Sequence, residues 1–346
     1  MKSFYDERGF LNAYALLKYG MAFNYIWGGR GTGKTYGFLK LCIEHNLKFI
    51  FMRSLESQTK MSKRPEMTLY KKINKDMGWN IIPSSLGVDN IYGMYKADED
   101  NTLIELVGYC VSLSTCANVR GIDFSDVDVI IYDEFIPKST ERHVTQAGFT
   151  FNDFYETVNR NRELLGEKPV QCFLLTNSNR LECDMFMYKK LMGKVSEMSL
   201  NKQSISIMRE KNIALFNLWD SPISDEKKDT VLYQSEDENS DFCNMSLKNE
   251  FYTADYSGIV SRKLKEYVPI CDVGEISIYE HKSKCLYYIT SHSSGSPEKF
   301  DVTTRDIKAF RRNYIWLYEY YLDKLVEFEN ITIKSLFEYY FREFKI

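Results

Sequence analysis

The sequence predicts an α/β protein in which a mostly parallel sheet, with helices on both faces, is followed by a connecting segment and a smaller α+β domain. Three observations predict it. A glycine-rich loop near residue 30 lies between an apolar run and a helical pattern. Short apolar runs then alternate with helical patterns up to about residue 215, as in parallel sheets. Finally, an acid-rich stretch begins near residue 220, and the pattern changes after it.

The chain of 346 residues is long enough for two domains. We predict a first domain at 1–215, a connecting segment at 216–250 and a C-terminal domain at 251–346. The stretch 220–241 carries eight acids against two lysines, which favours a linker or an exposed subdomain. Beyond it, residues 275–290 resemble two strands joined by a polar turn, and two amphipathic helical stretches rich in aromatic residues close the chain. Aromatic residues at helical spacing indicate core packing rather than a base-stacking platform.

The glycine-rich loop, GGRGTGKT, fits the pattern G-x-x-x-x-G-K-[ST]. It follows the apolar residues 25–27 and precedes a helical pattern, and KFIFMR at 48–53 is predicted as the next strand. Glycines let backbone N–H groups approach an anion, the lysine reaches the β- and γ-phosphates, and the threonine hydroxyl binds Mg²⁺. The predicted nucleotide-binding residues are Gly28, Gly29, Arg30, Gly31, Thr32, Gly33, Lys34 and Thr35. Arg30 either contacts phosphate or anchors the loop to the sheet.

The second chemical pattern is the buried run Val129–Tyr132, which ends in Asp133 and Glu134. Such a strand delivers its terminal aspartate to the Mg²⁺ shell. A glutamate directly after it polarises the attacking water, which indicates ATP hydrolysis rather than binding alone. Asp133 lies 99 residues after Lys34, which leaves room for a strand inserted next to the loop strand. The predicted ligands are therefore ATP and Mg²⁺, with Thr35 and Asp133 as metal-binding residues.

Several polar residues near these patterns are candidates for supporting roles. Asn177 follows the next strand, where it senses the γ-phosphate or caps a helix. Arg160 and Arg162 follow a helical pattern, and one of them serves as an arginine finger or both lie on a solvated face. Arg120 and Gly121 resemble a tight turn that presents a cation.

Bulk properties exclude other classes of protein. A net charge of −3 and a pI of about 6.0 argue against a passive nucleic-acid coat, which needs a basic surface. The eight cysteines are scattered and are predicted to be reduced core thiols, and the spacing of His281 and Cys285 does not make a zinc site. The N-terminus lacks the apolar core of a signal peptide, and no run approaches about 18 apolar residues. We therefore expect a cytoplasmic protein that does not bind membranes.

Four stretches in order, GGRGTGKT, NVRGIDF leading into DVIIYDEFIP, TVNRNRE and CFLLTNSN, make the sequence similar to a known family. They resemble the DNA-packaging motor ATPases of small tailed bacteriophages of the phi-29 type, a terminase-like branch of the additional-strand catalytic-glutamate P-loop ATPases. The resemblance implies a homomeric ring of five subunits, docked on the portal of an empty procapsid, that hydrolyses ATP to drive double-stranded DNA inward. It implies a location in the host cytoplasm, transiently on the procapsid and absent from the mature virion. Whether a packaging RNA joins ring and portal stays open.

The resemblance also implies roles by position. Arg160 would be the arginine finger supplied to a neighbouring subunit, Arg120 a second basic residue that reaches the neighbour's site, and Asn177 part of a coupling motif. Lys34 and Thr35 would be the loop lysine and metal ligand, with Asp133 and Glu134 as the acidic pair. The C-terminal domain would be a decayed RNase H-like fold.

That domain shows little sign of nuclease chemistry, which needs several converging carboxylates. Only Asp272 has a suggestive position, and Asp301 and Asp306 form no set with it. We predict a binding module for nucleic acid or the portal, with phosphate contacts from Lys282, Lys284, Arg311 and Arg312.

Two alternatives to a packaging translocase remain. One is an assembly or portal-binding protein that uses ATP only as a conformational switch, and Glu134 speaks against it. The other is a full terminase with an active C-terminal nuclease, which would depend on Asp272.

Overall fold

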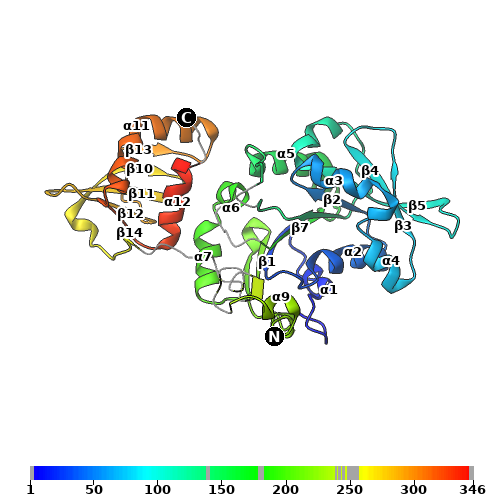
Figure 1. Ribbon diagram of the computed structural model, residues 1–346. Coiled ribbons are helices and arrows are strands. Elements are labelled where there is room, and N and C mark those ends of the chain that lie inside the picture. Colours follow the sequence, from blue (N-terminus) through cyan, green and yellow to red (C-terminus); the bar gives the residue numbers. More distant parts are fainter. Residues whose placement is uncertain are drawn as a thin grey trace. The chain divides into compact units, whose positions relative to one another are not determined.

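The protein is described by a computed structural model that covers residues 4–137, 141–177, 183–237, 240, 243, 246–247 and 257–342. The chain forms two compact units, each with its own sheet (Figure 1). The first unit comprises residues 1–179 and 198–251, and the second comprises 180–197 and 252–346.

The first unit is built on a nine-stranded sheet. Its six central strands are parallel to one another, and antiparallel strands are added at both edges. In sheet order the strands are β3 (Ile81–Ser85), β4 (Ile91–Ala97), β5 (Leu103–Ser112), β2 (Phe49–Arg53), β6 (Val129–Asp133), β7 (Gln171–Thr176), β1 (Phe23–Gly28), β9 (Ile213–Leu218) and β8 (Ile205–Met208). The predicted mostly parallel sheet is confirmed.

Strand β1, which leads into the glycine loop, lies between β7 and β9. Strand β7 separates β1 from β6, which carries Asp133, so a strand is inserted next to the loop strand as expected. The inserted strand follows Asp133 in the sequence. The strands β2 to β5, which lie between Lys34 and Asp133 in the sequence, are instead on the other side of β6. The carboxyl ends of β1, β7 and β6 are thus neighbours at one edge of the sheet.

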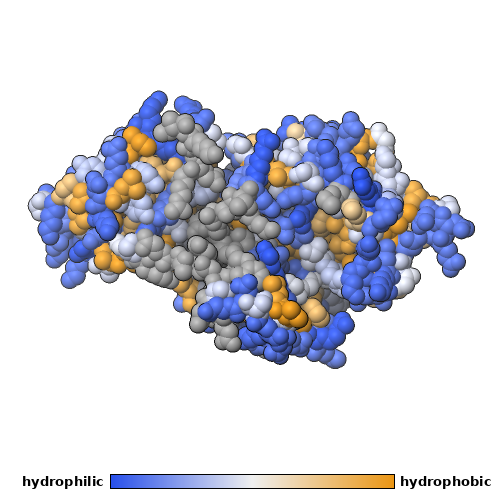
Figure 2. Space-filling model, viewed as in Figure 1, coloured by the Kyte–Doolittle hydropathy of each residue, from blue (hydrophilic) through white to orange (hydrophobic). Residues whose placement is uncertain are grey.

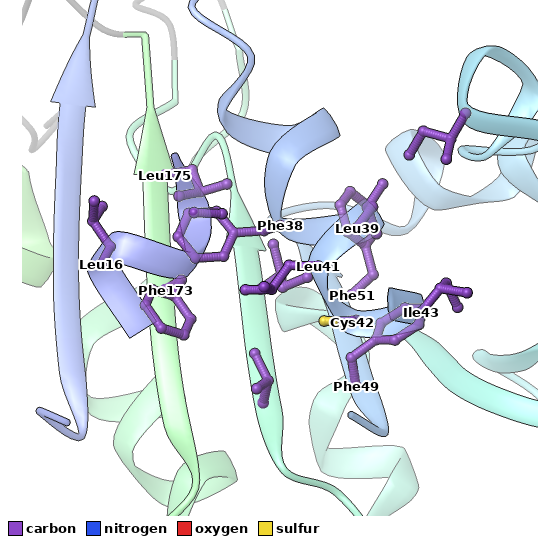
Figure 3. Close-up of a cluster of buried hydrophobic side chains, with 14 of the residues drawn as sticks. Leu16, Phe38, Leu39, Leu41, Cys42, Ile43, Phe49, Phe51, Phe173 and Leu175 are labelled. Carbon is purple, nitrogen blue, oxygen red and sulfur yellow. The ribbon is translucent and has the colours of Figure 1, made fainter. Parts of the chain in front are cut away.

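Helices cover both faces of this sheet. On one face, Phe38 of α2 (Lys34–Glu44) packs on Phe173 of β7 with ring centroids 4.3 Å apart, in the apolar cluster of Figure 3. On the other face, Phe151 of α5 (Ala147–Asn159) stacks on Tyr132 of β6 at 5.7 Å. The shorter helices described up to residue 237 are α1 (Ala13–Leu17), α3 (Glu56–Lys60), α4 (Lys71–Met77), α6 (Asp184–Tyr188), α7 (Met192–Leu200), α8 (Ile223–Lys227) and α9 (Val231–Gln234).

The predicted connecting segment 216–250 is corrected by the structure, because it belongs to the first unit. Strand β9 continues to Leu218 in the middle of the sheet, beside β1. After it, Ile223, Ser246 and Leu247 are buried. Most of the described residues from 225 to 237 are exposed. The exposure expected from the acidic composition is therefore present, but the segment is part of the first unit rather than a linker between two domains.

Residues 180–197, predicted within the first domain, belong to the second unit. The backbone N–H of Met192 donates to Glu275, and the hydroxyls of Ser196 and Thr332 are hydrogen-bonded. These long-range polar contacts have no local sequence signal.

The second unit has a five-stranded mixed sheet in the order β13 (Glu298–Phe300), β10 (Tyr267–Val273), β11 (Ile276–His281), β12 (Tyr287–Thr290) and β14 (Val326–Phe328). Strands β10, β11 and β12 form an antiparallel meander, with β13 and β14 parallel to its outer members. Helices α11 (Thr304–Leu322) and α12 (Ile331–Arg342) are the two predicted closing helices. Phe310, Tyr314 and Leu317 of α11 are buried. The other aromatic residues of this helix, Trp316, Tyr318, Tyr320 and Tyr321, are half-buried, so the predicted core role is confirmed only for part of the aromatic stripe. The RNase H-like relationship stays a prediction.

The eight cysteines all lie in the described part of the chain and form no disulfide bonds, and all except Cys285 are buried. Hydrophilic residues cover most of the surface visible in Figure 2, with apolar residues in scattered groups. Among the described residues, we find no helix that combines the length and the apolar composition needed to cross a bilayer.

Candidate active site

The loop Gly28–Thr35 connects the carboxyl end of β1 to the first turn of α2. Gly31 and Gly33 have φ values of 70° and 80°, in the left-handed region that favours glycine. Gly28 is needed for a different reason, because a Cβ there would lie 2.6 Å from the Leu218 side chain of β9. Glycine is therefore required at these positions by backbone conformation or by close packing.

Lys34, at the start of α2, is buried and turns back onto the loop. Its Nζ donates to the carbonyl oxygens of Gly28 (3.2 Å) and Gly29 (2.8 Å) and to Thr32 Oγ1 (3.0 Å). Burial lowers the pKa of Lys34 to about 7, while Asp133 opposes this and Lys227 adds to it. A bound polyanion would favour the charged ammonium.

Thr35 and Asp133, predicted as metal-binding residues, lie together at the sheet edge. Thr35 Oγ1 donates to Asp133 Oδ1 at 2.9 Å. A hydroxyl beside a carboxylate is the hard oxygen donor set that Mg²⁺ prefers, with phosphate and water completing its shell. No group of three or more His, Cys, Asp or Glu side chains able to hold a metal occurs among the described residues.

Arg53, the last residue of β2, was predicted only as the end of a strand. Its guanidinium bridges the two acidic residues, with Nη1 2.8 Å from Asp133 Oδ2 and Nη2 2.5 Å from Glu134 Oε2. The contact follows from the register, since β2 and β6 are parallel neighbours with Met52 beside Tyr132. The sequence does show an arginine at the carboxyl end of a buried strand. Its partners could not be predicted, because they depend on which strand lies next to β2.

Glu134, the predicted catalytic base, follows β6 with a φ of 53°. This left-handed backbone is uncommon outside glycine and, at a candidate active site, suggests a constrained side-chain position. While Glu134 is paired with Arg53, its carboxylate is held away from other partners. The geometry brings Lys34, Thr35, Asp133 and Glu134 to one edge of the sheet, as the sequence predicted.

Asn177 directly follows β7, the strand between β1 and β6. Thr176 is in register with Trp27 at the end of β1, and Leu175 with Asp133. Half-buried Asn177 therefore lies at the edge that carries the glycine loop and the acidic pair. Its role as a sensor stays a prediction.

The three candidate arginines contact other parts of the first unit. Arg160 directly follows α5, its side chain is 52% exposed, and its Nη1 lies 3.7 Å from Asp123. Arg120 pairs with Asp153 of α5. None of the contacts recorded for Arg120 or Arg160 in the described chain involves the glycine loop, Asp133 or Glu134. Their service to a neighbouring subunit stays a prediction.

Arg162, the alternative finger, is held by local contacts. Its Nη2 donates to the carbonyl oxygen of Ser125 at 2.8 Å, and that of Phe124 lies 3.5 Å away. Arg160 is more exposed than Arg162, and the carboxylate of Asp123 near its guanidinium is itself exposed.

In the second unit, Asp272 is surrounded by hydroxyl groups. Ser277, Ser293 and Ser296 donate to its carboxylate at 2.7, 2.7 and 2.5 Å. Asp301, the acid predicted not to join it, lies near Lys190 at 3.6 Å. These hydrogen bonds give Asp272 the surroundings of a structural residue. They do not resemble the group of converging carboxylates that a nuclease site needs.

One predicted phosphate contact is wrong. Arg311 is buried, and its Nε donates to the carbonyl oxygen of Tyr340, because Arg311 lies on the inner face of α11. Lys282, Lys284 and Arg312 are exposed, so their role in binding phosphate stays a prediction.

Comparisons with known proteins show what the whole chain is similar to. The family profile of the Podovirus DNA encapsidation protein (Gp16) matches residues 5–346. The DNA packaging protein of Bacillus phage phi29 is 22% identical, over 99% of both chains. That of Bacillus phage B103 is 23% identical, over 86% of this chain and 89% of the relative.

Two solved structures share the fold over nearly the whole chain. The bacteriophage Phi-29 viral genome packaging motor assembly has a TM-score of 0.63 at 18% identity, covering 96% of this chain and 98% of the other. The Phi-28 gp11 DNA packaging motor has a TM-score of 0.60 at 15% identity, covering 98% and 100%.

Proposed function

Because the chain belongs to the Podovirus DNA encapsidation protein (Gp16) family, we propose that it is the ATP-hydrolysing subunit of a motor that packages double-stranded DNA into a procapsid. The observation that carries the proposal is the meeting of Lys34, Thr35, Asp133 and Glu134 at one sheet edge, with β7 inserted between the two strands that deliver them. This arrangement supplies the parts that phosphoryl transfer to water needs.

We assign each part a step. Lys34 leaves its carbonyl partners to pair with the β- and γ-phosphates of ATP. Thr35 and Asp133 hold Mg²⁺, which neutralises charge on the phosphates when bound. Glu134, once separated from Arg53, accepts a proton from the attacking water. Arg53 would retain Asp133 and so keep that carboxylate oriented during the exchange.

ATP hydrolysis measured with and without double-stranded DNA and portal tests the proposal, with Lys34→Ala as the inactive control. A motor is expected to turn over faster when DNA and portal are present. Turnover by the wild type that neither DNA nor portal changes would favour the switch hypothesis. Equal activity in Lys34→Ala would remove the site assignment altogether.

We further propose a homomeric ring, in the host cytoplasm and transiently on the procapsid, in which Arg160 acts on a neighbour's nucleotide. Arg160→Ala should lower hydrolysis in the assembled ring by about a thousandfold, because an arginine finger stabilises the transferring phosphoryl group. Mixing Arg160→Ala with Lys34→Ala subunits should restore part of the activity, since some interfaces then hold one intact site. An Arg160→Ala ring with normal activity would contradict the finger assignment.

A further inference from the structure

The segment after β9 lies against the glycine loop, and Lys227 at the end of α8 reaches the loop directly. Lys227 Nζ donates to the carbonyl oxygen of Arg30, and a Cβ built on Gly31 would lie 2.6 Å from this Nζ. Nearby, the carbonyl oxygen of Ser246 would lie 2.9 Å from a Cβ on Gly29. The segment therefore covers the loop from Gly29 to Gly31, where the loop is predicted to receive phosphate.

Lys227 is half-buried there, and within the described part of the chain it has no carboxylate partner. Its neighbour Lys228 differs, since Lys228 Nζ lies 2.6 Å from Asp225. Burial and then the charge of Arg30 lower the pKa of Lys227. Cations from three positions thus converge on a loop whose backbone suits an anion.

We propose that Lys227 is a second phosphate-binding lysine of the nucleotide site, and that a nucleoside triphosphate takes it over from the carbonyl oxygen of Arg30. The inference rests on the proposed function and deepens it. The loop lysine Lys34 comes from the strand-to-helix turn, whereas Lys227 comes from the segment that follows β9. Phosphate binding therefore rearranges the contact between that segment and the loop.

The test is the affinity for the slowly hydrolysed probe ATPγS, measured for Lys227→Met, Lys227→Gln and Lys227→Arg, with Lys228→Met as the matched control. Lys227→Met should weaken binding about tenfold or more, because a charged hydrogen bond to phosphate is lost. Lys227→Gln should weaken it similarly, since an amide lacks the charge, and Lys227→Arg should keep most of it. Lys228→Met should stay within about twofold of the wild type, as expected for an exposed pair.

Two results would overturn the inference. Wild-type affinity in Lys227→Met would show that the lysine does not touch phosphate. Affinity lost in Lys227→Met but kept in Lys227→Gln would show that Lys227 acts only through a hydrogen bond to the Arg30 carbonyl oxygen, for which no charge is needed. Either result leaves the proposed function intact if the wild type hydrolyses ATP and Lys34→Ala does not. A wild type that neither binds nor hydrolyses ATP would instead refute the proposed function itself.

Discussion

Asp133 in the first unit and Asp272 in the second are both strand aspartates, and their partners differ in charge. Asp133 accepts a hydrogen bond from the Thr35 hydroxyl and pairs with the guanidinium of Arg53, which also holds Glu134. Asp272 accepts hydrogen bonds from three neutral serine hydroxyls. The first arrangement is a set of charged groups beside the glycine loop. In the second, neutral hydroxyl groups satisfy the hydrogen-bonding capacity of the carboxylate.

The difference indicates that a strand aspartate is suited to catalysis when a metal ion or water molecule can replace the groups that pair with its carboxylate. Arg53 compensates two neighbouring carboxylates, and a metal ion or a water molecule can replace part of that compensation. The serines around Asp272 satisfy its oxygens without creating any charge that a substrate would relieve. Three changes test this contrast.

Glu134→Gln should have the largest effect. Hydrolysis should fall by about a hundredfold to ten-thousandfold, because the amide cannot accept the proton of the attacking water, while ATP binding is kept. Steady-state phosphate release and ATPγS affinity measure the two properties. The matched change Asp272→Asn should leave both almost unaltered, and loss of DNA cleavage in Asp272→Asn would instead revive the nuclease hypothesis.

Arg53→Met should have an intermediate effect, on stability as well as on hydrolysis. The side chains of Asp133 and Glu134 are 9% and 32% exposed, so two like charges would be left with little solvent compensation. We expect a loss of about 2 kcal/mol in the free energy of unfolding, less than for a fully buried pair. Urea unfolding measures it.

The control for Arg53 is Arg262→Met in the second unit. Arg262 pairs with Glu327 through two contacts of 2.6 Å, but its side chain is 42% exposed, so the loss should stay below about 1 kcal/mol. Adding Glu134→Gln to Arg53→Met should return part of the stability, because the repulsion between the carboxylates disappears. Equal losses in both arginine variants would contradict the contrast between the two sites.

Asp272→Asn should have the smallest effect, a loss of about 1 kcal/mol at pH 7. Burial raises the pKa of Asp272, but hydrogen bonds from Ser296, Ser293 and Ser277 outweigh it and hold the pKa below its ordinary value of 3.8. A depressed carboxyl pKa stabilises the folded state above the ordinary value, and this contribution is lost as the pH falls through the folded value. Thermal unfolding should therefore separate wild type and variant more at pH 7 than at pH 3.

The sequence predicted the parts of the site that are local in the chain. The spacing within Gly28–Thr35 and the run into Asp133 and Glu134 each specify a strand, a turn and a chemical group without long-range information. Arg53 was out of reach because its partners depend on β2 lying next to β6. Lys227 was out of reach because it meets the loop from almost two hundred residues away.

The burial of Arg311 could have been predicted from the sequence. Arg311 lies four residues after Ile307 and three before Tyr314, both buried, so helical periodicity already placed it on the inner face of α11. For a charged residue on a predicted apolar stripe, its position along the helical repeat should therefore be used before its charge to predict whether it is buried. The division of the chain at 180–197 had no comparable signal, since only contacts made after folding reveal it.

The position of β1 also has a consequence for protein synthesis. Its two ladder partners, β7 and β9, begin at residues 171 and 213, so the strand that carries the glycine loop stays without neighbours while most of the first unit is being translated. A parallel strand with unpaired backbone groups and apolar faces is vulnerable to misassembly. A ribosome-bound nascent chain should therefore complete the surroundings of its glycine loop late, after β9 has left the exit tunnel.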